Sequence, residues 1–169
     1  AEKEAAQLIA NAVSDEIKQT SGTIVGIAGG ACGGDILFHE ACYAQNIATQ
    51  PYLAVPPDQF SAKSVQRGGP AWVERFLRLT TRTAPRVLGD STALPAWLAG
   101  RADSYTVWNR NNLWMLYNAL ALNPQFVTLI ALWDRSGGDG PGGTADLVQQ
   151  ATTRGHKVVI LDAKPLKTL

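Results

Sequence analysis

The sequence has little of what marks several common classes of protein. Its two cysteines, Cys32 and Cys42, are too few for a disulfide scaffold and lack the partner residues of a zinc site. No uninterrupted apolar stretch is long enough to cross a bilayer. The 15 basic and 14 acidic side chains leave a net charge of +1, which gives no electrostatic reason to expect nucleic acid or a membrane as partner. The sequence therefore predicts no metal site, and no cofactor is expected.

The composition indicates one globular domain. Of the 169 residues, 46% are hydrophobic and 17% are charged, which is enough apolar material for a sizeable core. We expect a single domain over residues 1–169, with an N-terminal helix over 1–20 in place of a signal peptide. Both cysteines are expected to be small buried residues in a reducing, cytoplasmic compartment. The chain begins without methionine, which is consistent with a domain excised from a larger protein or with processing.

Apolar periodicity predicts an alternation of helices and strands along the chain. The helix that begins near residue 33 is expected to have an inner face of Ile36, Leu37, Ala41, Cys42 and Ala44. Helices are predicted over 2–19, 33–46, parts of 60–82, from about Arg110 to 122, and 144–155. Strands are predicted over 23–30, 49–57, 85–89, 126–133 and 156–162. Residues 89–107 show loop signals with short helices.

Strands that alternate with helices are typical of α/β proteins. We therefore predict a Rossmann-like three-layer fold, with a mostly parallel sheet and helices on both faces. Such sheets bind ligands beyond the carboxyl ends of their strands, near the point where the strand order reverses. Two glycine-rich segments follow predicted strands at this kind of position, over residues 29–34 and 137–143.

The two glycine-rich segments are candidates for an anion site. Each precedes a predicted helix, whose first N–H groups and dipole attract a phosphate without any lysine. Glycine lets the backbone approach an anion closely and adopt positive φ, and Thr144 can also cap its helix. A mobile surface turn is the alternative interpretation, and neither segment has the Walker A or G-x-G-x-x-G spacing. The candidate phosphate-binding residues are Gly29, Gly30, Gly33, Gly34, Gly140, Gly142, Gly143 and Thr144.

Four polar residues are further candidates for ligand contact, each with a structural alternative. Asp35 lies in the first turn of a helix, where a carboxylate is favoured by the dipole. Arg110 is expected to meet a phosphate or a ribose hydroxyl, or else to lie in a helix entry capped by a neighbouring asparagine. Asp134 ends the best strand and either contacts the ligand or binds N–H groups of its own loop. Glu40 is a candidate acid or a solvated helix carboxylate.

The segment "PGGTAD", residues 141–146, resembles the "PGG-x-GT-x-x-E" signature of the Lonely Guy-type phosphoribohydrolases of the SLOG superfamily. "GIAGGACGGDILFHEACYAQ", residues 26–45, is similar to the first glycine-rich strand, loop and helix of that superfamily, which also includes the Smf/DprA proteins. The order of these elements matches over roughly residues 20–162. The closer likeness is to SLOG-like domains of bacterial signalling and defence proteins.

This resemblance implies a Rossmann-like domain that binds a nucleotide or a nucleotide-derived molecule. Gly142, Gly143 and Thr144 would then hold the phosphate. The glutamate of the enzymes has no clean counterpart, because Asp146 is shorter and differs in its offset from the glycines. The expected function is therefore a ligand sensor acting through a fused effector domain or a homo-oligomer. The alternatives are a phosphoribohydrolase that uses Asp146 and Glu40, and an oligomerisation module.

Overall fold

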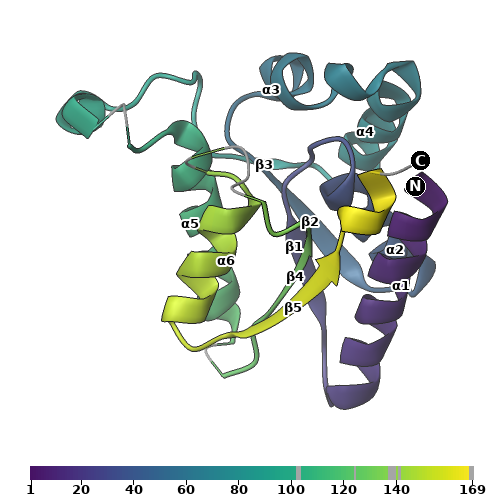
Figure 1. Cartoon of the computed structure of the whole chain (residues 1–169). Coiled ribbons are helices and arrows are strands. Elements are labelled where there is room, and N and C mark those ends of the chain that lie inside the picture. Colours follow the sequence, from purple (N-terminus) through teal and green to yellow (C-terminus); the bar gives the residue numbers. More distant parts are fainter. Residues whose placement is uncertain (102–103, 124, 137–139, 141, 168–169) are drawn as a thin grey trace.

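The structure is a computed structural model that describes residues 1–101, 104–123, 125–136, 140 and 142–167 (Figure 1). Helices and strands alternate along the chain, as the apolar periodicity predicts. Among the described residues, no helix has the length and apolar character needed to span a membrane. The elements are α1 (Glu2–Gln19), β1 (Val25–Ala28), α2 (Gly34–Ala44), β2 (Ala48–Leu53), α3 (Pro57–Ser64), η1 (Gln66–Gly68), α4 (Pro70–Arg82), β3 (Arg86–Val87), η2 (Ala96–Arg101), α5 (Val107–Leu122), β4 (Thr128–Trp133), α6 (Thr144–Thr153), β5 (Lys157–Asp162) and η3 (Lys164–Lys167).

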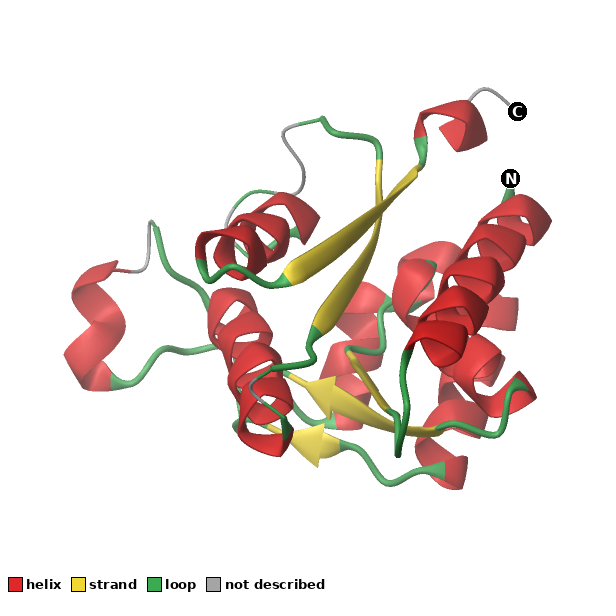
Figure 2. Ribbon diagram, turned by 90° about the horizontal axis from the view of Figure 1, so that it is seen from below, coloured by secondary structure: helices red, strands yellow, loops and turns green. Residues whose placement is uncertain are grey.

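The strands form two parallel sheets in place of the single sheet that the sequence predicts. One sheet has the order β1-β2-β3 and the other pairs β4 with β5 (Figure 2). Within the described strands, β1 and β4 are not paired with each other. From β1 the strand order runs to β2 and β3, whereas from β4 it runs to β5. The space between β1 and β4 is therefore the switch point of this α/β fold.

Helices cover both faces of the strands, so the α/β fold with Rossmann-like layering is confirmed. Helices α1 and α2 lie on one side of the strands and α5 and α6 on the other (Figure 1). The first and last described helices, α1 and η3, lie side by side in both views and pack against each other (Figures 1 and 2).

Two groups of buried side chains form the core. One joins α2, α3 and α4 to the end of β2 and is centred on Leu53, Phe60 and Phe76. The other lies between α1 and α2 and includes Cys42, which is buried as predicted. Ala44 is the exception to the predicted inner face of α2, because it is exposed in the last turn of that helix. Cys32 is only partly buried.

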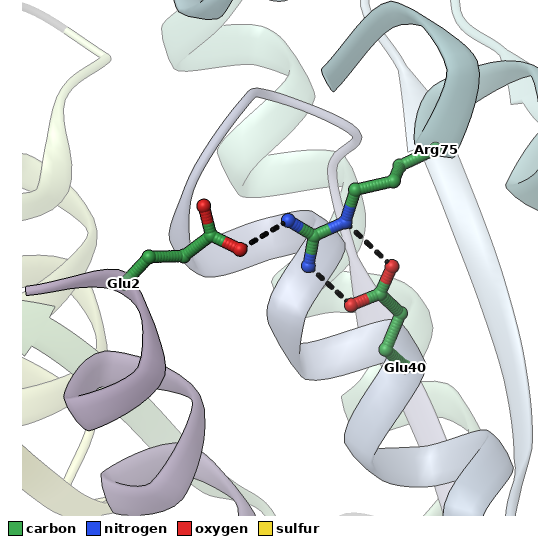
Figure 3. Close-up of polar contacts among 3 residues, drawn as sticks. All are labelled: Glu2, Glu40 and Arg75. Carbon is green, nitrogen blue, oxygen red and sulfur yellow. Dashed lines mark hydrogen bonds and ion pairs between the residues drawn. The ribbon is translucent and has the colours of Figure 1, made fainter. Parts of the chain in front are cut away.

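A single arginine connects three helices on the surface of this core. The Arg75 guanidinium of α4 donates one hydrogen bond to Glu2 of α1, over 2.8 Å, and two to Glu40 of α2 (Figure 3). It also stacks on the Trp72 ring, 4.1 Å from the ring centroid. The two carboxylates, Glu40 foremost, raise the pKa of Arg75. The side chain of Arg75 is 14% exposed, so water screens this network less than an ordinary surface ion pair.

Replacement of Arg75 by methionine is therefore expected to lower the free energy of unfolding by about 1 kcal/mol, since two carboxylates lose a shared partner. Urea denaturation measures the change. The matched control is Arg78→Met, because the pair of Arg78 with Glu74 has side chains that are 64% and 70% exposed. That variant should differ from wild type by less than about 0.5 kcal/mol. Equal losses in the two variants would contradict the role assigned to Arg75.

Candidate functional site

The two glycine-rich segments line one cavity of about 640 Å³, although they lie far apart in the sequence. Gly29 and Gly34 contribute from the segment after β1, and Gly142, Gly143 and Thr144 contribute from the segment after β4. The facing edges of β1 and β4 also line this cavity, so it occupies the switch point between the two sheets.

The first loop is closed by the carboxylate at the start of α2. The backbone N–H of Ala31 donates to Asp35 Oδ2 over 3.1 Å. A side chain at Gly29 would not fit, because its Cβ would lie 2.5 Å from the same oxygen. Burial raises the pKa of Asp35, and the hydrogen bond from Ala31 opposes that shift. Asp35 therefore shapes the loop while it also lines the cavity.

His39 connects the first loop to β2 through two hydrogen bonds that the sequence alone does not reveal. Its ring is fully buried, with Nε2 2.8 Å from the Gly29 carbonyl and Nδ1 2.7 Å from Thr49 Oγ1. Burial lowers the pKa of His39 to about 4, against the opposing effect of its backbone partners. The ring is thus neutral at pH 7. Because a carbonyl can only accept, Nε2 donates to Gly29, and Nδ1 accepts from the Thr49 hydroxyl.

The other glycines of the first loop have different roles. A Cβ at Gly30 would lie 2.9 Å from the Phe76 ring and 3.1 Å from Leu53, so Gly30 packs directly on the core. Gly33 has φ of +99° in open space, and it precedes the first turn of α2 without a side-chain cap. Neither of these two glycines is a cavity-lining residue, whereas Gly34, next to Gly33, is one.

The second loop rests on the first turn of α5. A Cβ at Gly142 would lie 2.5 Å from Trp108 Cβ and 2.8 Å from the Asn109 nitrogen, and its φ is +88°. Asn112 Nδ2 donates to the Gly142 carbonyl over 2.8 Å. The Gly143 N–H donates to the Gly140 carbonyl over 3.0 Å, which closes a turn before α6. Asp139 and Pro141 of this segment lie outside the described residues.

The predicted cap of α6 is wrong, because Gly143 occupies the cap position and Thr144 is the first helical residue. No side chain caps the helix there. The expected start of α5 is also corrected. Thr106 and Asn109 form a capping box, so the helix begins at Val107 and neither Asn109 nor Asn111 is its cap.

Several predicted site residues are not brought to the cavity. Asp146 Oδ2 accepts from Asn109 Nδ2 over 2.9 Å, which ties α6 to α5. Glu40 is held by Arg75 on the outer surface. Asp134 Oδ1 accepts from the N–H and hydroxyl of Ser136, the structural alternative for that residue. Arg110 lies in the first turn of α5 and is not a cavity-lining residue. The site residues placed along the cavity are Gly29, Gly34, Asp35, Gly142, Gly143 and Thr144.

Two cations and two aromatic rings also line the cavity. Lys63 and Arg67 are exposed cations at the end of α3 and in η1, and their spacing of four residues is the only local signal for them. Phe60 and Trp108 line the same space and meet edge to face, with ring centroids 5.7 Å apart. The described lining residues include one carboxylate, Asp35, against these two cations. Helix N-termini, cations and aromatic rings together suit an anionic ligand with a planar part.

The neutral state of His39 makes stability depend on pH. The His39 ring gains a proton near pH 6.5 in the unfolded chain and near pH 4 in the folded chain. The free energy of unfolding therefore decreases as the pH falls through that window. The loss should total about 3 kcal/mol. Asp35, with a raised pKa, acts in the opposite direction. Denaturation of wild type and of His39→Gln between pH 7 and pH 4 should show a shallower decline in the variant, since Asp35 is common to both. Parallel curves for wild type and His39→Gln would contradict this assignment.

Replacement of Gly142 by alanine tests how closely the second loop packs against α5. Positive φ alone costs an alanine about 1 kcal/mol, and the contacts with α5 should add about 1–3 kcal/mol. Gly140→Ala is the matched control, because Gly140 has φ of +76° in open space. Thermal and urea denaturation should therefore show a clearly larger loss at position 142. Similar losses of stability at both positions would mean that α5 accommodates the added methyl group at little cost, which would contradict the close packing of Gly142.

Comparison of the chain with family models, with curated proteins and with solved structures finds no match. What the protein binds must therefore be inferred from the geometry of this cavity. That geometry is a space at the switch point of an α/β fold, bordered by two glycine-rich loops, two cations and two aromatic rings.

Proposed function

We propose that this chain is a SLOG-like domain that binds a nucleotide-derived small molecule in the cavity between its two glycine-rich loops. The observation that carries the proposal is that segments far apart in the sequence border one space, each at the start of a helix. The volume of about 640 Å³ is within the range that small-molecule sites occupy.

The phosphate is assigned to the end of the cavity formed by Gly34, Gly143 and Thr144. Among the described residues, no side chain caps the first turn of α2 or α6, so their N–H groups can donate to an anion. Lys63 and Arg67 add positive charge to the lining. The base is assigned to the rings of Phe60 and Trp108, which offer apolar surface in the same cavity.

The positions of the carboxylates support a ligand sensor more than a hydrolase. Cleavage of the base from the ribose needs a carboxylate beside the positive charge that develops on the ribose. Asp146 is engaged by Asn109 and Glu40 by Arg75, and neither lines the cavity. The carboxylate that does line it, Asp35, is held by the Ala31 N–H, and burial raises its pKa, which disfavours the charged form. The sequence resemblance implies a bacterial signalling or defence protein. Ligand binding would then act on a fused effector domain or on a second copy of the chain.

Thermal shift measurements test the proposal with nucleoside monophosphates, cyclic nucleotides and ADP-ribose. A ligand at about 100 times its dissociation constant should stabilise the fold by about 2.7 kcal/mol. Nucleosides without phosphate are the control and should stabilise less. If no compound of the panel raises the unfolding temperature, the proposed function is wrong.

The two cations allow a sharper test of where the phosphate lies. The double variant Lys63→Gln, Arg67→Gln should bind the phosphate-bearing ligand about 5- to 30-fold more weakly, because each exposed charge contributes about 0.5–1 kcal/mol. Lys18→Gln is the control, since Lys18 lies on α1 and pairs with Asp15. Calorimetric titration gives both constants. Unchanged affinity in the double variant would place the phosphate elsewhere.

A further inference from the structure

Asn111 carries a buried polar atom that the fold leaves without a partner. The residue lies in the second turn of α5, is 4% exposed and lines the cavity. Its Nδ2 donates to the Tyr52 carbonyl over 3.1 Å, whereas its Oδ1 has no hydrogen-bond partner. Within the described part of the chain, His156 Nε2 is the other such atom, and His156 does not line the cavity.

The orientation of the Asn111 amide is settled by its neighbour. The Tyr52 carbonyl can only accept a hydrogen bond, so the atom that faces it must be the nitrogen. The unpartnered atom is therefore an acceptor. Buried acceptors in folded proteins are almost always satisfied, by the protein or by an ordered water. Since no group of the described chain does so here, a water molecule or a bound ligand is expected to donate to Asn111 Oδ1.

The surroundings of Asn111 separate it from the anion end of the cavity. Its neighbour Asn112 directs its amide nitrogen to the Gly142 carbonyl in the second loop. Asn111 instead contacts the end of β2, one residue beyond Pro51, which pairs with the last residue of β1. An acceptor oxygen disfavours a phosphate, so a ligand that reaches both places has an anionic part and a neutral donor part.

We infer that Asn111 Oδ1 accepts a hydrogen bond from the bound ligand and selects nucleotides that present an N–H or O–H donor there. This inference rests on the proposed function and adds a specificity-determining residue to it. In adenosine 5′-monophosphate the neutral donors are the two ribose hydroxyls and the amino group of the base. A site built to accept from such a group discriminates against analogues that lack it, because the acceptor is then left buried and unpaired.

The experiment removes these donors one at a time. The series is made on the mononucleotide that binds wild type most tightly. For adenosine 5′-monophosphate it comprises the 2′-deoxy and 3′-deoxy nucleotides and purine riboside 5′-monophosphate, which lacks the amino group. Titration of wild type should show one analogue that binds about tenfold more weakly than the parent. The identity of that analogue tells whether the ribose or the base supplies the donor.

Variants at position 111 then assign the preference to this side chain. In Asn111→Leu and Asn111→Ala the parent and that analogue should differ by less than about twofold. Asn118→Leu is the control on the same helix, because Asn118 bonds the Trp114 carbonyl and does not line the cavity. Circular dichroism shows whether each variant folds.

The outcomes separate this inference from the proposed function. If wild type binds no nucleotide of the panel, the proposed function fails and the inference fails with it. If the parent nucleotide binds but all its analogues bind equally well, the site is real and the inference alone is wrong. The inference is also overturned if folded Asn111→Leu or Asn111→Ala keeps the tenfold preference, since another group must then accept from the ligand.

Discussion

The close approach of Gly142 to the first turn of α5 is the constraint on which the candidate site depends. A side chain there would overlap Trp108 and the Asn109 backbone, so the second loop reaches this position only as glycine. Asn112 holds the carbonyl of the same residue, and Asn109 holds Asp146 in the next helix. The N-terminus of α6 is thereby brought beside the space between the two sheets.

The first loop reaches the same space through buried polar contacts. Asp35 accepts from the backbone of Ala31, and the neutral His39 ring bridges Gly29 to Thr49 of β2. Glycine at these positions thus allows close packing within the protein, in addition to any approach of the backbone to a ligand. A glycine-rich sequence alone does not distinguish these two uses, because both require a residue without a side chain.

Much of the architecture follows from local pattern. The helix over 2–19 and the strand at 128–133 are where periodicity places them, since each depends on residues that are neighbours along the chain. The start of α5 differs because Thr106 and Asn109 cap each other, a signal hidden by the hydrophobic residues that follow. The polar site was less predictable. Glu40 and Asp146 looked available in the sequence, but Arg75 and Asn109, which engage them, are distant in it.

The sequence by itself determined the α/β class, the order of the elements and the presence of two glycine-rich loops beyond strand ends. Only the tertiary structure decided that the strands divide into two sheets, that both loops border one cavity, and that Lys63, Arg67 and Asn111 line it. The physical reason is the range of the interactions. Helix and strand formation depends on nearby residues, whereas strand pairing and the satisfaction of buried polar atoms depend on which distant segments pack together.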